Sequence, residues 1–344
     1  MELWEPAGSW IVAVVVGGLP RSPLGEATPG AGWPERCLPF SAAAVSSPAM
    51  QPVVVYLVAV FLGGALLAPW LHALAQVFAA VVPELADKPF HRYVNRSLLL
   101  LAVVGMVPLL RHLGIRSFAT IGLGRGERMR RVGAGFLLGV ASLGAVAVVA
   151  LALGARTLRA DLEGGYVLDK LLQAIATAAT VAVLEEALFR GAFYGALRRS
   201  LPPLPALLAS SAIYAIVHFL ESAPHGGAVT WWSGLAIMPR MLAGFVDPDR
   251  LVPGFFNLLL AGILLAVAYA RSGSLWLSIG IHAGWIFCLR LYRSVTVDVA
   301  TPACVWCGSE KLIDGWLGLP ALALALAAVL ALPGTTRTGG RGLI

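Results

Sequence analysis

Three ionisable side chains, Glu185, Glu186 and Arg190, lie within six residues of an otherwise apolar part of the chain. An ionisable side chain at bilayer depth costs on the order of 2.5–3.5 kcal/mol, so three together need partners or a function. Glu186 and Arg190 are four residues apart, so on a helix they share a face and can form an ion pair. Glu185 points about 100° away. It must therefore stay neutral or meet a partner on another helix.

Two histidines in other apolar segments are candidate partners for Glu185. His218 follows Tyr214 by four residues, and His282 lies between two glycines in a later segment. Polar groups in a membrane bundle face one another rather than lipid. With a rise of about 1.5 Å per residue, the three side chains lie within roughly two helical turns of a common depth. We therefore expect Glu185, His218 and His282 to converge.

A carboxylate and two imidazoles support two kinds of chemistry. In the first, Glu185, His218 and His282 ligate Zn²⁺ and a water completes the shell. In the second, no metal is present, and the glutamate activates water while the histidines stabilise a tetrahedral oxyanion. Both describe the attack of water on a carbonyl carbon, and the sequence leaves both open.

The elements that position these residues follow from composition. Hydrophobic residues make up 58% of the 344 residues and charged residues 12%, with a mean hydropathy of +0.82. This is too little polar surface for a soluble globule and is typical of a polytopic membrane protein. The apolar segments lack the alternation of barrel strands, and most approach the roughly 20 residues of a spanning helix. The predicted fold is an all-α membrane bundle of about eight transmembrane helices, near residues 53–71, 97–112, 132–154, 170–190, 205–220, 252–270, 274–292 and 316–332.

The net charge of +7 does not indicate nucleic-acid binding, because the basic residues are divided among the connections between spans. Six arginines lie between the second and third spans, which the positive-inside rule assigns to the cytoplasm. Arg290 and Arg293, at the outer end of the seventh span, do not follow that rule. The expected partners are the lipid bilayer and a membrane-associated protein or peptide, and the sequence does not indicate the oligomeric state.

The chain divides into three parts. Residues 1–49 are rich in Pro and Gly, and we interpret them as a disordered leader or a miscalled start; residues 50–335 form the transmembrane domain, and 336–344 a short basic cytoplasmic tail. Cys304 and Cys307 fall in a connection outside the cytoplasm. A single CxxC motif there predicts a loop disulfide or free thiols rather than a zinc or catalytic site.

The order of these motifs resembles that of the CAAX protease and bacteriocin-processing (CPBP, or Abi) intramembrane endopeptidases. The likeness rests on Glu-Glu-x-x-x-Arg at 185–190, an aromatic-x-x-x-His motif ending at His218, and the segment 262–276 that leads to His282. It covers roughly residues 53–287. The resemblance implies an integral membrane protease.

The resemblance also implies roles for the individual residues. Glu185 would activate water, Glu186 and Arg190 would support it, and the two histidines would bind metal or steady the oxyanion.

The chain departs from the family pattern at two positions. Tyr214 stands where the family usually has Phe, and Ile286 stands where it has Asn or Asp four residues after the second histidine. Isoleucine neither binds metal nor donates a hydrogen bond. Either another polar group, such as Asn257 or Tyr214, substitutes, or turnover is weakened; loss of one oxyanion donor costs about 10²- to 10³-fold in rate in other enzymes.

The leading hypothesis is an intramembrane endopeptidase that uses glutamate-activated water and two histidines. A catalytically weakened relative that binds membrane peptides in maturation or immunity is the second, and a proton-coupled transporter is the third. The richness in Ala, Gly and Arg indicates a GC-rich bacterial genome, so we expect a multi-pass protein of the bacterial inner membrane.

Overall fold

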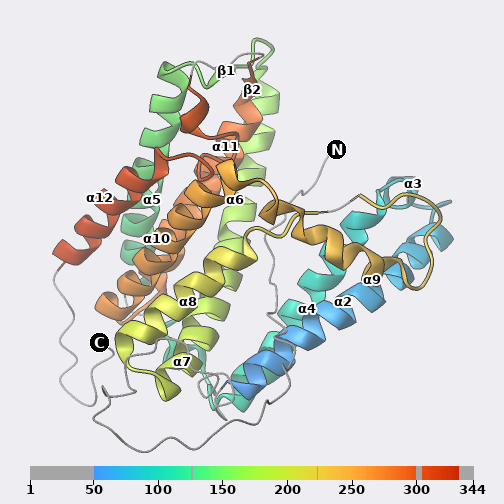
Figure 1. The fold of residues 1–344 in the computed structure, drawn as a ribbon, viewed down its shortest axis with the longest axis horizontal. Coiled ribbons are helices and arrows are strands. Elements are labelled where there is room, and N and C mark those ends of the chain that lie inside the picture. The colour runs from blue at the N-terminus through green and yellow to red at the C-terminus, as the bar shows by residue number, and fades with distance from the viewer. Residues whose placement is uncertain (1–49, 125–126, 223, 300–303, 333–344) are drawn as a thin grey trace, which may run out of the picture.

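A computed structural model describes residues 50–124, 127–222, 224–299 and 304–332. Figure 1 shows a bundle of long helices with one very short two-stranded sheet. The predicted all-α membrane bundle is therefore confirmed. The leader expected at 1–49 and the tail expected at 336–344 lie outside the described residues.

The helices of the described residues follow one another along the chain. They are α2 (Gln51–Val77), α3 (Pro83–Ala86), α4 (Phe90–His112), α5 (Arg128–Ala152), α6 (Gly164–Glu186), α7 (Gly195–Ser200), α8 (Pro203–Val217), α9 (Ser233–Ile237), α10 (Pro248–Ser272), α11 (Leu275–Val295) and α12 (Gly318–Ala331). A π-helical segment, Ala187–Tyr194, joins α6 to α7, and 3₁₀ turns cover Phe118–Ile121, Met238–Phe245 and Val305–Cys307.

Among the described residues, six helical segments are long and apolar enough to cross a membrane, the longest being the continuous segment Gly164–Ser200. The shorter apolar helices α8 and α12 have 15 and 14 residues. Together these eight correspond to the eight predicted spans. Two of them are shorter than the roughly 20 residues of a full crossing.

Helices α5 and α11 pack backbone against backbone. Gly135 and Gly139 of α5 face Gly280 and Gly284 of α11, and a Cβ atom at any of the four would clash with backbone atoms of the other helix. Small residues spaced four apart allow such close approach in membranes, where lipid supplies no hydrophobic force between helices. Gly280 and Gly284 lie two residues before and two residues after His282, so this histidine is at the contact between the two helices.

The two ends of α11 are fixed differently. At its start, the amide of Leu275 donates to the carbonyl oxygen of Gly122 and the indole of Trp276 to that of Gly124, so α11 begins beside the α4–α5 connection. At its other end, β2 (Thr296–Asp298) pairs antiparallel with β1 (Arg156–Leu158), which follows α5. Figure 1 shows both strands at one end of the bundle.

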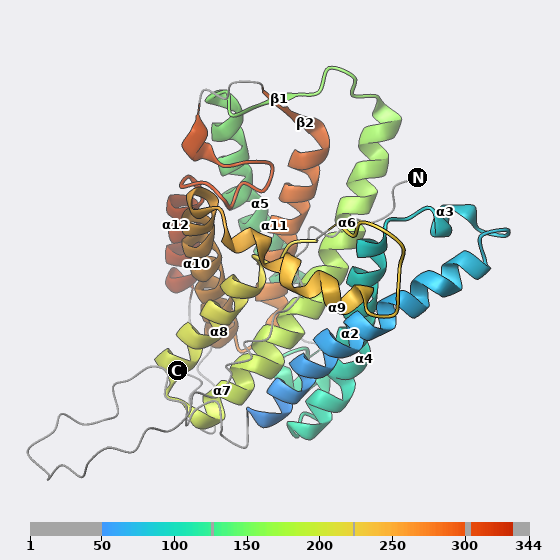
Figure 2. The same ribbon diagram turned by 45° about the vertical axis from the view of Figure 1, so that its right-hand side comes forward.

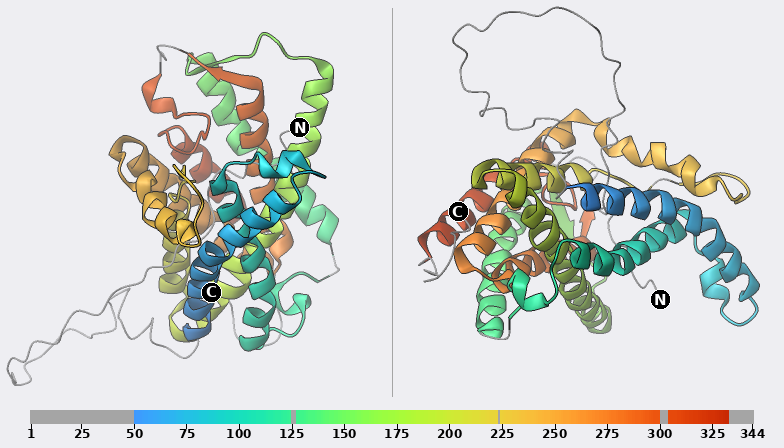
Figure 3. Two further views of the ribbon diagram at one scale, coloured as in Figure 1. Left: turned by 90° about the vertical axis from the view of Figure 1, so that its right-hand side faces the viewer. Right: turned by 90° about the horizontal axis from the view of Figure 1, so that it is seen from below.

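The α2–α4 pair lies to one side of the other long helices, and α9 crosses α2 (Figures 2 and 3). Gly234 of α9 sits against the backbone of Ala65, and Tyr56 of α2 donates to the carbonyl oxygen of Ala102 of α4, 2.9 Å away. This arrangement places one face of α4 opposite α6 and α11.

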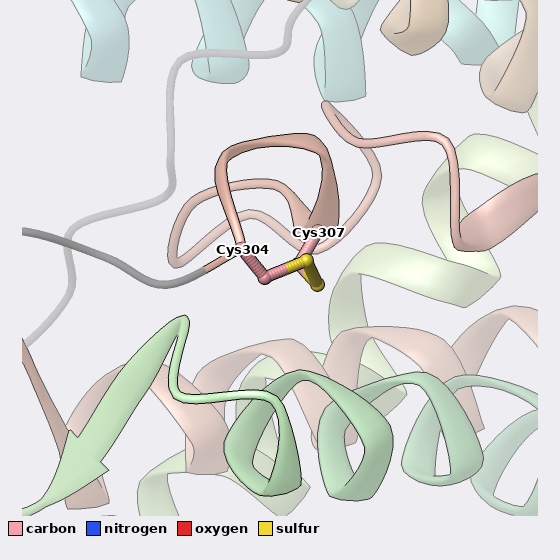
Figure 4. Close-up of a disulfide and its surroundings, with 2 residues drawn as sticks. All are labelled: Cys304 and Cys307. Atoms are coloured by element: carbon pink, nitrogen blue, oxygen red, sulfur yellow. A yellow bond between two sulfur atoms is a disulfide. The ribbon is translucent and has the colours of Figure 1, made fainter.

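The connection between β2 and α12 is anchored to the bundle. Cys304 and Cys307 form a disulfide (Figure 4), one of the two states expected for this motif. Asn257 of α10 donates both amide hydrogens to this connection, to the carbonyl oxygens of Ile313 (2.9 Å) and Gly315 (2.7 Å).

Candidate active site

Glu185 and Glu186 are the last two residues of α6, and the π-helical segment begins directly after them. Both carboxylates and the Arg190 guanidinium are at most 2% exposed. Arg190 Nη1 donates to Glu186 Oε1 over 2.8 Å, which is the predicted ion pair. π-helical turns are rare and are frequently found at functional sites.

The Glu186–Arg190 pair is held from three sides. Arg190 Nη2 donates to the Gly262 carbonyl oxygen of α10 over 3.2 Å, and the guanidinium carbon lies 4.7 Å from the centroid of the Tyr214 ring. On the opposite side, His282 Nδ1 lies 3.0 Å from Glu186 Oε1. One carboxylate therefore orients both an arginine and a histidine. No sequence pattern indicated the contact with the Gly262 carbonyl oxygen.

We expect the Glu186–Arg190 pair to make a large contribution to the free energy of unfolding. Arg190→Met should lower the unfolding free energy, measured by SDS titration, by about 3–5 kcal/mol, because it leaves a buried carboxylate without its cation. The double variant Glu186→Gln/Arg190→Met has no unpaired charge and should lose less. Equal losses in the single and double variants would contradict the ion-pair explanation.

The three residues expected to converge do so. Glu185 Oε2 lies 3.6 Å from His282 Nε2 and 3.7 Å from His218 Nε2. His282 is in the middle of α11, and His218 directly follows the last residue of α8. Three helices thus bring a carboxylate oxygen and two ring nitrogens to one place.

The other ring nitrogens define the protonation of both histidines. His218 Nδ1 lies 2.7 Å from the backbone carbonyl oxygen of Tyr214, which only accepts, so Nδ1 carries the hydrogen. His282 Nδ1 similarly donates to the Glu186 carboxylate. In the neutral rings both Nε2 atoms therefore present lone pairs toward Glu185 Oε2, which has no hydrogen-bond partner. Three acceptors at one point require a hydrogen donor or a cation between them.

The expected zinc ligands do not form a preassembled metal cluster. Within the part of the chain that the structure describes, no group of three His, Cys, Asp or Glu side chains is arranged to hold a metal ion. The lone pairs of His218 and His282 have the chemistry of zinc ligands and Nδ1 partners typical of bound zinc. A water molecule, which can donate two hydrogens, would satisfy two of these three acceptors.

A cavity of about 390 Å³ gives access to these groups. Glu185, His218 and His282 line it together with apolar side chains of α5, α6 and α10. Its volume is that of a typical small ligand site and suits a short stretch of peptide.

Ile286 and its two possible substitutes all line the same cavity. Asn257 cannot donate to a substrate, because its amide hydrogens already bond to carbonyl oxygens of the β2–α12 connection. The hydroxyl of Tyr214 lies 3.5 Å from His282 Nε2 and is buried. Tyr214 is therefore the better placed substitute for the polar group that Ile286 lacks.

One supporting contact was missed by sequence reasoning. Trp285, which lines the cavity beside His282, donates its indole hydrogen to Ser142 Oγ of α5 over 3.0 Å. Only the α5–α11 crossing brings these residues together. A serine in an apolar helix is too common to have indicated this contact.

Part of the chain matches a known protein family. Residues 167–288 match the family model described as type II CAAX prenyl endopeptidase Rce1-like. Over these residues the chain is similar to CAAX proteases. The resemblance inferred from the motifs is thereby confirmed, and the matched region includes all five candidate residues from α6 to α11. Neither the comparison with curated proteins nor that with solved structures found a significant match.

The match supports protease activity at the level of the family. The matched region lies within an integral, multi-pass membrane protein, and the family match implies substrates that are proteins at the bilayer.

Proposed function

We propose that the chain is an intramembrane endopeptidase of the bacterial inner membrane that hydrolyses peptide bonds by glutamate-activated water. The observation that carries the proposal is the approach of Glu185 Oε2 to the Nε2 atoms of His218 and His282 at the cavity wall. A water molecule there donates one hydrogen to the carboxylate and one to an imidazole nitrogen.

The chain's own residues can carry out every proton transfer of this reaction. Glu185 takes a proton from the water while the water oxygen bonds to the substrate carbonyl carbon, which leaves a negative charge on the carbonyl oxygen. The Tyr214 hydroxyl donates to this oxyanion. Glu185 returns the proton to the amide nitrogen as the carbon–nitrogen bond breaks, releasing a carboxylic acid and an amine.

The supporting residues act by positioning. Glu186, held by Arg190, fixes the His282 ring through Nδ1, and the Tyr214 carbonyl fixes the His218 ring in the same way. A fixed ring keeps its Nε2 lone pair directed at the water and reduces the reorganisation needed during reaction.

The function is tested with the purified chain in detergent and a detergent-solubilised library of bacterial membrane-protein peptides. New amino termini, counted by mass spectrometry, are expected to rise with time and protein concentration. Their absence under conditions where the protein remains folded would refute the proposed activity.

We expect the purified protein to hold well below one zinc per chain, because Glu185, His218 and His282 do not form a preassembled metal group. Elemental analysis of the wild type beside Glu185→Gln and His282→Ala measures this. If zinc is bound, these three residues would hold it and it would supply a more acidic water. One zinc per wild-type chain, lost in both variants, would overturn the metal-free mechanism.

The weakened peptide binder is a second candidate because of one observation. Ile286 lines the cavity one helical turn beyond His282 and offers no polar group. A binder would retain peptides in this cavity without releasing new amino termini. Substitution of Ile286 by Asn separates the two functions.

A further inference from the structure

On three helices, the residues that line the catalytic cavity begin near the level of the site and continue toward the same end of the bundle. On α4 the lining residues run from the start of the helix to Leu99, and on α10 they end with Ala261. On α11, which turns back from the end of α10, they begin with His282 and continue toward the end of the helix. The cavity therefore extends toward β2, which directly follows α11 (Figure 2).

The cavity reaches the surface at this end. Glu221 of the α8–α9 connection and Lys311 of the β2–α12 connection both line it, and their side chains are 46% and 48% exposed. The two side chains form an ion pair over 3.3 Å. On the α4 side, Asn95 Nδ2 donates to Ser222 Oγ over 2.7 Å, and both residues line the cavity. We call the opening bordered by Asn95, Glu221, Ser222 and Lys311 the mouth.

The other end of the site is covered by buried residues. The π-helical segment that begins directly after Glu186 is buried at all eight positions. Its Gly191 packs against Ile121 of the α4–α5 connection, whose side chain would lie 3.3 Å from a Cβ atom at position 191. The amide of Leu275 also donates to the Gly122 carbonyl oxygen of that connection. Of the residues of this connection that the structure describes, none lines the cavity.

The covered end is the cytoplasmic one by the distribution of charge. Six arginines lie within residues 111–131, and the positive-inside rule assigns this arginine-rich connection to the cytoplasm. Arg290 and Arg293, near the other end of α11, are exceptions to that rule. The mouth then lies on the extracytoplasmic side.

Two features beside the mouth agree with this assignment without using charge. The indoles of Trp306 and Trp316, in the same connection as Lys311, are 54% and 45% exposed. Exposed indoles are enriched at the headgroup level of a bilayer. The same connection contains the disulfide of Cys304 and Cys307, a bond that persists in oxidising compartments outside the cytoplasm.

The size and depth of the cavity restrict what enters it. Its volume is about 390 Å³, whereas a spanning helix, about 10 Å wide and 30 Å long, fills roughly 2,000 Å³. His282 lies thirteen residues before Val295, the last residue of α11, or about 20 Å along the helix axis. An extended chain advances about 3.3 Å per residue and covers this depth with about six residues. An extended segment fits, and a whole spanning helix does not.

On the basis of the proposed function, we propose that the substrate enters through the mouth from the extracytoplasmic side, as an extended polypeptide segment that reaches about six residues inward to the scissile bond. The substrate class is therefore a secreted peptide or the extracytoplasmic part of a membrane protein. A cytoplasmic tail does not reach the cavity, because the π-helical segment and the arginine-rich connection cover the site from that side.

Sealed membrane vesicles of opposite orientation test the side of entry. A randomised, internally quenched peptide library coupled to dextran, which does not cross a membrane, is added outside vesicles that contain the chain. Right-side-out vesicles should cleave it, and inverted vesicles should cleave it at least tenfold more slowly until detergent opens them. Vesicles with Glu185→Gln protein supply the background rate. Faster cleavage by intact inverted vesicles would overturn the inference.

Blocking the mouth tests the route. A membrane-impermeant maleimide attached to polyethylene glycol is applied to Glu221→Cys, at the mouth, and to Arg128→Cys, at the exposed start of α5. In right-side-out vesicles the first variant should be labelled and lose cleavage at least tenfold relative to the same protein before labelling. The second should be labelled in inverted vesicles and keep its rate in detergent. The reverse labelling pattern, or full activity with the polymer at position 221, would contradict the inference.

A binding measurement separates failure of this inference from failure of the proposed function. Cleavage in detergent together with entry from the inverted side would overturn the inference and leave hydrolysis intact. If wild type cleaves nothing even in detergent, the proposed function fails, and binding of the dextran-coupled peptides to Glu185→Gln vesicles still reports the side of entry. Binding to right-side-out vesicles would then support the inference, and binding to inverted vesicles would refute it.

Discussion

Glu185→Gln is expected to lower kcat by at least 10²-fold and up to about 10⁴-fold, with KM for the same peptide nearly unchanged. The amide keeps the size of the carboxylate but does not accept a proton from water. It also keeps an oxygen near the Nε2 atoms of His218 and His282, so the protein should fold normally. Rates of new amino-terminus formation, with far-UV circular dichroism as a folding check, measure the effect.

The matched control is Glu163→Gln, at the exposed start of the same helix. It should change kcat by less than about twofold, since exposed charges contribute little. Wild-type rates in the Glu185→Gln protein would remove Glu185 from the reaction. Equal losses in both variants would point to a general effect of charge on α6.

Tyr214→Phe is expected to lower kcat about 10²- to 10³-fold, the usual cost of removing one oxyanion donor. Its hydroxyl lies 3.5 Å from His282 Nε2, and neither Ile286 nor the engaged amide of Asn257 can replace it. The ring of Phe still packs over Arg190, so the loss should be in kcat rather than in stability.

Ile286→Asn in the Tyr214→Phe background provides the decisive comparison. Position 286 lines the cavity, so an amide there can donate to the oxyanion and should recover at least tenfold of the lost rate. No recovery would show that the two positions are not exchangeable. If wild type is inactive and Ile286→Asn alone creates hydrolysis, the natural chain is a peptide binder.

Local spacing predicted much of this site. The Glu186–Arg190 pair follows from four-residue spacing, and it forms although the helix changes to π geometry between the two residues. The convergence of Glu185 with two histidines follows from the cost of buried polar groups in lipid. The eight apolar segments correspond to the six long apolar helical segments and to α8 and α12, because a segment surrounded by lipid must satisfy its own backbone hydrogen bonds.

Contacts between distant helices were not predictable in the same way. The hydrogen-bond partners of Nδ1 in His218 and His282 depend on ring orientation, which packing sets. Arg92 and Arg96 precede the span predicted at 97–112, and only the placement of α4 brings them to the cavity. Periodicity also could not show that α8 and α12 end short of a full crossing, because helix ends depend on neighbouring elements.

Because of the four glycines between α5 and α11, the relative positions of the site side chains depend on residues that have no side chains themselves. His282 sits between two of them, at a contact where a single methyl group would force the helices apart. Separation by even a fraction of an ångström would move one imidazole relative to the acid on α6, while the chemical groups themselves stayed intact. Variation at these positions would therefore alter turnover through distance alone.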